Sequence, residues 1–413
     1  SSIKEPFAIF DDYEKKMKLS MTDSAQKAGA VPENFGELLH EFPMLALQFK
    51  PDQLSKCTLE LEIMLDFMLI CAGEKDWMHN PHIRAKFQIF MDALLPIDEK
   101  EGPRRPEKPS LLIKNNAFYD KYLLRNLMIL FIQVEKTGAG SQFYDKLNYR
   151  HHFCRIINNL AGYDIVKSER SKALMERIDM MTKELPEEFL QFVNLLMNDL
   201  IYLLDESLSR LRVIKKFQDE EETEEYQNLP PNEKQQRLEG YNKAKQEVTS
   251  FLTLLNQYYA LFASLTAINQ EAFLSEELKD KVVNNLNYCL AELNGKNAMS
   301  LKVKNMKELR FDPKFILKGI INVYLNLRKS DAFVRSVVED ERSFDIKLFE
   351  KTLKVLVREN LLDDKVEAFE EMLDMMKEVM NQKAAEDDFI KELDIPDEFM
   401  DPLTCEIMKD PVM

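Results

Sequence analysis

Apolar residues recur at helical spacing along much of the chain. The apolar series from Val193 to Ile214 advances three or four residues at each step, and the stretch from Val248 to Leu265 repeats the pattern. This spacing lines one face of an α-helix, so both stretches predict helices that bury one side. We find no convincing strand alternation in the first 390 residues. The pattern therefore predicts an all-α body.

Other signals indicate where individual helices begin and end. The segment from Leu54 to Cys71 becomes apolar almost all round, which is typical of a helix buried among others, and Gly73 is placed to act as a left-handed cap just past its end. Helix starts are predicted at Ser275, which precedes two glutamates, and at Pro186. A further long helix is expected from about 116 to 136.

Three segments interrupt this helical pattern. Residues 98–110 carry three prolines and are expected to form a loop. Residues 219–225 are interpreted as an acidic linker or helix end. Residues 383–394 are a polar segment that precedes a tail without the helical pattern of the body. Many helices joined by short connections predict a bundle or a solenoid of stacked helices. Since no repeat of fixed length is visible, the solenoid is expected to be irregular, with a longest helix of roughly 40 Å. An acidic docking site at 219–225 is the alternative to a solvated linker.

Composition narrows the class of function. The chain has 413 residues, 10 glycines and a formal net charge of −16, which is the wrong sign for a nucleic-acid-binding protein. The five cysteines are scattered and form no Cys-x-x-Cys pair, which indicates reduced thiols in the cytosol or nucleus. No uncharged apolar run reaches membrane-spanning length, so no membrane partner is expected. Because the chain lacks an initiator Met, we interpret it as a fragment.

Conventional catalytic motifs are missing from the sequence. There is no Gly-rich phosphate loop, no His-Glu-x-x-His and no Gly-x-Ser-x-Gly, so no cofactor is expected. The sequence HHFC at 151–154 gathers three candidate metal ligands, but no second cluster completes a site. We therefore predict structural histidines near a helix start and no metal. Cys405 as a thioester-forming nucleophile is a minor alternative, because it has no obvious His partner.

The tail reads DIPDEFMDPLTCEIMKDPVM from Asp394 to Met413. Its apolar and Asp-Pro positions are similar to the opening of a U-box, a small α+β, RING-like module without zinc. The resemblance implies that 394–413 is the N-terminal part of a U-box, cut off at Met413. It also implies two sets of roles: Pro402, Leu403 and Cys405 bind a ubiquitin-conjugating enzyme, while Phe399, Ile407, Met408 and Val412 belong to the core of the module.

The body resembles the core of chain-elongation factors of the ubiquitin-fusion-degradation type. The likeness is carried by HNPHIRAKF at 79–87 and by the stretches 131–153, 198–211, 286–295, 311–327 and 340–350. It implies an irregular armadillo-like helical solenoid over residues 1–390. It further implies a cytoplasmic and nuclear factor that binds a charged conjugating enzyme and extends ubiquitin chains on substrates bound for the proteasome. Ubiquitin, ubiquitinated substrates and an AAA segregase ATPase are the other expected partners.

RING-like modules hold the conjugating enzyme and bias its ubiquitin thioester toward attack, which is catalysis by positioning. No covalent nucleophile is therefore expected in this chain, and the 413-residue fragment by itself is expected to be inactive. The alternative function is a non-catalytic helical-repeat scaffold or adaptor whose tail only mimics a U-box. Residues 143–146 and 203–207 are interpreted as helix-packing segments, with a docking surface as the alternative.

Overall fold

The computed structural model describes residues 32–95, 112–113, 117–137, 142–161, 169–295, 301–362 and 365–392, and these form helices and their connections without a strand. The all-α prediction is confirmed for this part of the chain. The elements in chain order are α4 (Glu33–Phe49), α5 (Pro51–Leu54), α6 (Thr58–Gly73), α7 (Pro81–Leu94), α9 (Ala117–Gln133), η1 (Val134–Thr137), α10 (Gln142–Ala161), α11 (Glu169–Glu184), α12 (Pro186–Glu220), α13 (Glu224–Gln227), α14 (Pro231–Ile268), η2 (Glu271–Phe273), α15 (Glu276–Asn294), α16 (Pro313–Leu327), α17 (Asp331–Glu339), α18 (Ile346–Arg358) and α19 (Val366–Glu392).

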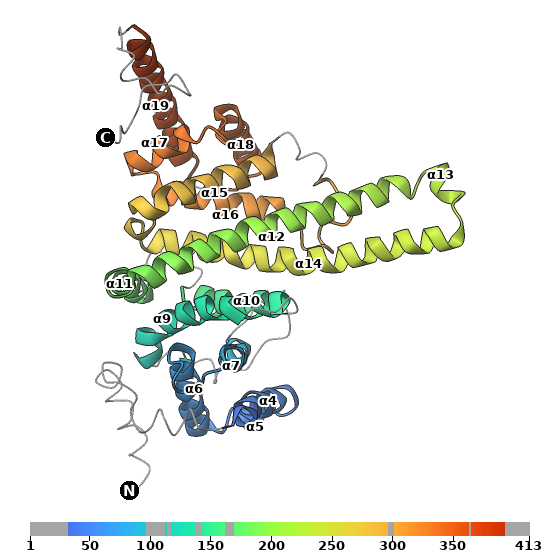
Figure 1. Ribbon diagram of the computed structural model, residues 1–413, viewed down its shortest axis with the longest axis vertical. Helices are drawn as coiled ribbons and strands as arrows, with labels where there is room; N and C mark the ends of the chain where they lie inside the picture. Colours follow the sequence, from blue (N-terminus) through green and yellow to red (C-terminus); the bar gives the residue numbers. More distant parts are fainter. Residues whose placement is uncertain are drawn as a thin grey trace, which may run out of the picture.

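The helices are stacked in successive layers along the long axis of the molecule (Figure 1). α4 packs on α7, α7 packs on α10, α10 packs on α14, and α14 packs on α16, while α15, α17 and α19 continue the stack to its other end. This arrangement confirms a helical solenoid. Helix length varies from the 4 residues of α5 to the 38 of α14, which agrees with an irregular stack. An armadillo-like repeat and a domain boundary near 390 remain predictions.

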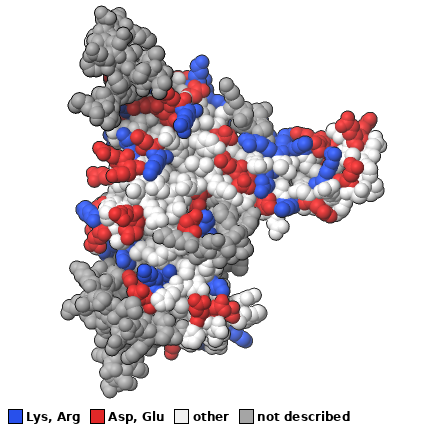
Figure 2. Space-filling model, in the orientation of Figure 1, with Lys and Arg blue, Asp and Glu red and all other residues white. Residues whose placement is uncertain are grey.

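The two longest helices form a hairpin that projects from the stack. α12 has 35 residues and α14 has 38, so α14 is about 57 Å long and exceeds the expected 40 Å. Their far ends meet at α13, beyond the body in Figure 1, and we call residues 213–245 the arm. The acidic segment 219–225 lies at its tip, where the side chains are mostly exposed. Figure 2 shows basic and acidic atoms side by side along the arm and acidic atoms at the tip. The exposure agrees with a solvated helix end, and the acidic docking site stays a prediction.

α14 also carries a long apolar stretch. Within the described residues it is the one helix that is long and apolar enough to cross a bilayer by length and composition, and 67% of its apolar window is buried inside the fold. The core helix of a protein with a large interior has the same properties. Contacts with α10, α12 and α16 account for the burial of this stretch.

The end of α6 differs from the sequence prediction. The helix begins at Thr58, because 51–54 forms the separate α5, and Gly73 is its last residue without a left-handed backbone. A Cβ atom built on Gly73 lies 2.3 Å from Asn126 Oδ1, so a side chain there is excluded by the close approach of α9. The glycine is therefore required for helix packing and does not act as a cap.

Two predicted helix starts are confirmed, at Pro186 and after Ser275. The Ser275 hydroxyl makes no capping bond, whereas the carboxylate of Asp312 accepts two backbone N–H bonds at the start of α16. The polar segment 383–394 is helical as far as Glu392, because α19 continues through it. The predicted loop at 98–110 lies outside the described residues.

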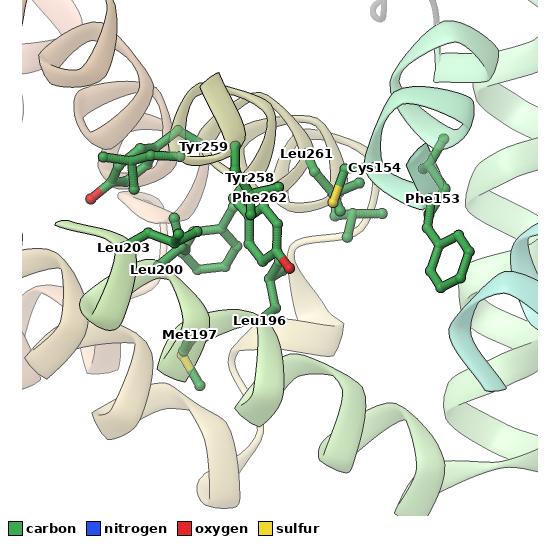
Figure 3. Packing of buried hydrophobic residues seen from close by; sticks show 14 of the residues in the cluster. Phe153, Cys154, Leu196, Met197, Leu200, Leu203, Tyr258, Tyr259, Leu261 and Phe262 are labelled. Atoms are coloured by element: carbon green, nitrogen blue, oxygen red, sulfur yellow. The ribbon is translucent and has the colours of Figure 1, made fainter. Parts of the chain in front are cut away.

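The core is a continuous apolar cluster that runs through the stack. Figure 3 shows its centre, where side chains of α12 face aromatic side chains of α14. Burying a Leu or Phe side chain stabilises a fold by roughly 1.5–3 kcal/mol, so this helix pair contributes strongly to the body. The residues labelled there from the two helices are Leu196, Met197, Leu200, Leu203, Tyr258, Tyr259, Leu261 and Phe262.

Asparagine side chains connect neighbouring layers through backbone carbonyls. A helix carbonyl can accept a second hydrogen bond, and a buried amide that found no partner would cost free energy. We call these contacts the asparagine bridges. They are Asn126 to the carbonyl of Leu69 (2.9 Å), Asn158 to that of Gln257 (3.1 Å), Asn285 to that of Met197 (3.0 Å), Asn287 to that of Val337 (3.1 Å) and Asn326 to that of Ala263 (3.0 Å).

Candidate functional site

The residues predicted to form the functional site lie outside the described part of the chain. This holds for the conjugating-enzyme contacts Pro402, Leu403 and Cys405 and for the four predicted core residues of the U-box, so their roles remain predictions. The last described element is α19, which ends at Glu392 and lies at the end of the stack opposite α4 (Figure 1). By chain connectivity, the tail therefore begins at this end of the solenoid.

The most elaborate polar cluster of the body is centred on Arg150 in α10. Its guanidinium is fully buried and donates hydrogen bonds to Asp199 Oδ2 at 2.7 Å and to the carbonyl of Phe131 at 2.9 Å. Glu135 lies 2.8 Å away, and the guanidinium carbon lies 4.1 Å from the centre of the Phe131 ring. The Tyr258 hydroxyl donates to Asp199 at 2.8 Å. We call this cluster the Arg150 centre; it joins α9, α10, α12 and α14.

The electrostatics of the Arg150 centre indicate a structural role. Burial raises the pKa of the Asp199 carboxyl, and the charge of Arg150 and the hydrogen bond from Tyr258 act in the opposite direction. Burial also raises the pKa of the Tyr258 hydroxyl well above its usual value. The guanidinium is enclosed by protein partners and has no exposed surface for a substrate. The centre therefore fixes four helices relative to one another.

The sequence pattern did not predict a role for Arg150 or Asp199, although both residues lie in stretches that carried the family resemblance. A signal was present. Asp199 is three residues after Leu196 and four before Leu203, so a carboxylate lies on the apolar face of its helix. Arg150 likewise lies between apolar residues on one face of α10. A charged residue at such a position needs a buried partner of opposite charge.

The histidines of the HHFC sequence also serve packing. His152 Nδ1 lies 2.7 Å from Asp92 Oδ2 on α7, and Arg155 lies 3.5 Å from the same oxygen. Burial lowers the pKa of His151 to about 4, with further contributions from His152 and Arg155. Both histidines lie in the middle of α10, so their predicted place near a helix start was wrong. Within the described residues, no group of three His, Cys, Asp or Glu side chains is arranged to hold a metal ion.

Three of the cysteines are poorly suited to nucleophilic chemistry. Cys71, Cys154 and Cys289 are free but buried, and burial raises the pKa of each thiol, that of Cys289 to about 12. A thiol in such surroundings stays protonated and inert at neutral pH. Cys57 is free and exposed. Cys405, the minor candidate for a thioester, lies outside the described residues.

The segment 203–207 acts in helix packing, as predicted. Leu203 is buried, and Asp205 accepts a hydrogen bond from the Tyr288 hydroxyl at 2.5 Å, which joins α12 to α15. In the segment 143–146, Lys146 pairs with Glu135 at 3.0 Å, beside the Arg150 centre. The side chains of the three residues before Lys146 lie outside the described part.

Comparison with known proteins identifies relatives over nearly the whole chain. The sequence model of the family described as ubiquitin elongating factor core matches residues 7–377. The chain is 30% identical over 416 residues to ubiquitin conjugation factor E4 A of Bos taurus, which covers 98% of this chain and 38% of the relative. It is 31% identical over 354 residues to E4 ubiquitin-protein ligase UFD2 of Saccharomyces cerevisiae, covering 84% of this chain and 36% of the relative.

A plant relative gives the same result. The probable ubiquitin conjugation factor E4 of Arabidopsis thaliana is 30% identical over 402 residues, or 96% of this chain and 37% of the relative. The chain thus spans a little over a third of the length of the curated relatives that it matches.

Proposed function

The chain belongs to the ubiquitin elongating factor core family, and from this premise we propose that it is part of a ubiquitin chain-elongation factor. In this proposal the helical solenoid is the scaffold, and the U-box-like tail that follows α19 recruits a charged ubiquitin-conjugating enzyme. The observation that carries the proposal is the family match over residues 7–377, which ends shortly before the tail at 394–413. The names of the relatives, conjugation factor and ubiquitin-protein ligase, support the same activity.

The chemistry of the body agrees with catalysis by positioning. The buried thiols and the Arg150 centre are closed to a substrate, so in this proposal these groups contribute to the rigidity and spacing of the helices. A scaffold of this kind contributes by holding the conjugating enzyme and the acceptor ubiquitin within reach of each other. The ubiquitin thioester stays on the conjugating enzyme until a lysine of the acceptor attacks it. The proposed enzyme is thus a RING-type transferase without a covalent intermediate of its own.

Leu403 is the proposed anchor for the conjugating enzyme. An apolar side chain in a polar loop is a suitable centre for an interface, and Pro402 and Cys405 flank it in the sequence. Cys405 is smaller than the apolar residue that many U-boxes carry at this position, so its share of the contact is expected to be modest. Phe399, Ile407, Met408 and Val412 are proposed as the core of the module.

The remaining partners follow from the resemblance to chain-elongation factors. We propose that the protein acts in the cytoplasm and nucleus on substrates that already carry one or a few ubiquitins. The proposed partner is an AAA segregase ATPase that delivers these substrates to the proteasome. The acidic net charge of −16 suits basic protein partners better than nucleic acid.

A chain-extension assay on the full-length protein tests the proposal. It contains activating enzyme, conjugating enzyme, ATP and a monoubiquitinated substrate, and compares the wild type with Leu403→Ala. We expect long chains with the wild type and a loss of roughly tenfold or more in the variant, because truncation of an interface anchor typically costs at least 1.4–2 kcal/mol.

A matched control is Leu238→Ala, which removes a partly exposed leucine of the arm, on a different element from the tail. This variant is expected to extend chains at the wild-type rate. If neither the wild type nor the control extends chains with any of a panel of conjugating enzymes, the protein is a non-catalytic helical scaffold. If Leu403→Ala is as active as the wild type, the proposed contact between Leu403 and the conjugating enzyme is wrong although the activity stands.

A further inference from the structure

The exposed face of α18 is basic, although the chain as a whole is acidic. Four cationic side chains recur there at steps of four, three and four residues, so they lie on one face of the helix. All four are exposed, and the row that they form is about 16 Å long. We call this row the basic stripe, and its members are Lys347, Lys351, Lys354 and Arg358.

The opposite face of α18 fixes the direction in which the basic stripe points. Leu348, Phe349 and Leu356 are buried, and the helix packs against α15 and α19 near the α19 end of the stack (Figure 1). The buried Thr352 hydroxyl accepts a hydrogen bond from the side chain of Asn294 at 2.8 Å. The helix is therefore held with its basic stripe facing away from the body.

Most of the charge of the basic stripe is not neutralised by the fold. Among the described residues, the ammonium groups of Lys347 and Lys354 have no carboxylate partner. Lys351 donates a hydrogen bond to the backbone carbonyl of Asn294, which carries no net charge. These three cations are therefore free to attract an acidic group from another molecule.

The carboxylates in and next to α18 already have cationic partners. Glu350 is the one carboxylate within the helix, and it pairs with Lys377 of α19 at 3.0 Å. Glu359, which follows the helix, pairs with both Lys314 and Arg358. The exposed face of α18 consequently keeps a net positive charge.

Two exposed apolar side chains lie at the Arg358 end of the basic stripe. Val357 of α18 is 54% exposed, and Phe315 of α16 is 45% exposed. The ion pair between Lys314 and Glu359 joins the start of α16 to the end of α18, and thus brings together the segments that carry them. Apolar side chains beside cationic ones give a polypeptide an anchor that pure charge attraction does not provide.

We infer that the basic stripe is a docking surface for an acidic helical segment of a partner protein. Carboxylates on such a segment recur at the same steps of three and four residues, so four of them can meet the four cations. An apolar residue of the same segment would contact Val357 and Phe315. The partner is then held at the end of the stack from which the tail begins, and the inference does not depend on the proposed function.

The charge of the whole molecule favours a short protein segment over other anions. Interactions between exposed charges are screened beyond about 8 Å at physiological salt, so a short segment senses mainly the basic stripe. A nucleic acid or an anionic bilayer extends over more of the surface and therefore meets the net charge of −16. The apolar pair at the end of the stripe also suits a polypeptide better than a phosphate backbone.

Fluorescence anisotropy with a defined probe tests the inference on the full-length protein. The probe is a fluorescein-labelled helical peptide with glutamates at positions i, i+4, i+7 and i+11 and a leucine beside the last one. We expect the wild type to bind it and Lys347→Glu with Lys354→Glu to bind at least roughly tenfold more weakly, because two attractive contacts become repulsive.

The matched control is Lys216→Glu with Lys243→Glu in the arm. It makes the same change in net charge at two lysines whose side chains are 77% and 76% exposed. This variant is expected to bind the probe like the wild type. No binding by the wild type would overturn the inference, and so would an equal loss in both double variants, because the attraction would then come from overall charge.

Carbodiimide crosslinking of the wild type, read by mass spectrometry, locates the bound probe. Amide bonds from its glutamates to lysines of the basic stripe are expected, and crosslinks mainly to the arm would contradict the inference. Val357→Asp should weaken binding several-fold, whereas Leu238→Asp, at an exposed leucine of the arm, should not. Tighter binding of a short DNA duplex or of phosphatidylserine vesicles than of the probe would assign the stripe to another class of partner and overturn the inference.

Discussion

The body and arm halves of the α12–α14 hairpin belong to the same two continuous helices but are stabilised differently. In the body, α12 and α14 bury nearly every apolar side chain of their stripes against α9, α10, α15 and α16. In the arm, the buried residues of these two helices are Ile214, Phe217, Gln218 and Ala244. An unbroken helix can therefore have a stable half and a half that opens easily.

Local contacts hold the arm together. Phe217 stacks on Tyr241 with ring centres 4.5 Å apart, and Tyr226 approaches Phe217 edge-on. The side chain of Gln218 accepts a hydrogen bond from the backbone N–H of Lys304 at 2.8 Å, which braces the arm against the 301–311 segment. Most other contacts along the arm are exposed ion pairs, which contribute little. The comparison teaches that helix continuity does not imply uniform stability.

The largest expected effect comes from breaking the Arg150 centre in the body. Asp199→Ala leaves a buried guanidinium without its main carboxylate and Tyr258 without its acceptor. We expect a loss of about 3–5 kcal/mol in the free energy of unfolding, measured by urea denaturation with hydrogen exchange to locate the opening. Exchange in the body should become much faster.

A double variant separates charge from packing. Arg150→Met with Asp199→Leu replaces the pair by apolar side chains, and we expect it to be clearly more stable than Asp199→Ala. If the double variant is less stable than the single one, the Arg150 centre contributes to the free energy of unfolding through a hydrogen-bond geometry that apolar side chains cannot replace. In that case the loss in Asp199→Ala does not come from an uncompensated buried charge.

An intermediate effect is expected from acidification. Burial lowers the pKa of His151 from its ordinary 6.5 to about 4, so the unfolded chain takes up a proton in a pH range where the folded chain does not. Stability is therefore present above pH 6.5 and falls as the pH drops toward 4. The loss at pH 4.5 is expected to be about 2–3 kcal/mol, and His151→Gln should remove that part of the slope.

The arm contains no histidine, so this component of the pH dependence should appear in body amides. His79→Gln is the matched control, because His79 is exposed, and it should leave the pH profile unchanged. Urea midpoints at pH 7 and pH 4.5 measure the difference. A His151→Gln profile as steep as that of the wild type would show that other groups dominate.

The smallest expected effect is in the arm. Arg237 lies 3.1 Å from Glu220, and both side chains are partly exposed. A double-mutant cycle with alanine at both positions is expected to give a coupling of at most about 1 kcal/mol, which disappears in 1 M salt. The coupling between Arg150 and Asp199 should survive the same salt. Equal salt sensitivity of the two pairs would remove the distinction between the arm and the body.

Periodicity in the sequence predicted the helices of both regions but not how they pair. The series 193–214 and 248–265 each indicate a buried face, and the acidic segment between them indicates a solvated connection. Neither signal states that the helices continue past the body as an arm, because exposed helical residues leave no apolar stripe to read. Gly73 shows a related limit: a sequence cannot tell a glycine that caps a helix from one that admits a neighbouring side chain.

The candidate site was predicted in a different way. The U-box interpretation of Leu403 rests on resemblance over twenty residues of the tail, and the described helices do not reach it. The Arg150 centre was missed because its partners are 49 and 59 residues apart in the chain, Arg150 with Asp199 and Asp199 with Tyr258. Pairings over such separations are decided by the stacking of layers, which spacing within one helix does not encode.

The asparagine bridges have a mechanical consequence. Each one crosses an interface between layers, and Asn285 and Asn326 both cross the interface between the α12–α14 pair and the α15–α16 pair. A force that pulls the α4 end away from the α19 end therefore passes through the successive interfaces in series. Links in series do not share a load, and the weakest interface between layers sets the force at which the whole body lengthens. Under force, two layers should therefore separate at the weakest interface, while the packing within the other layers stays intact.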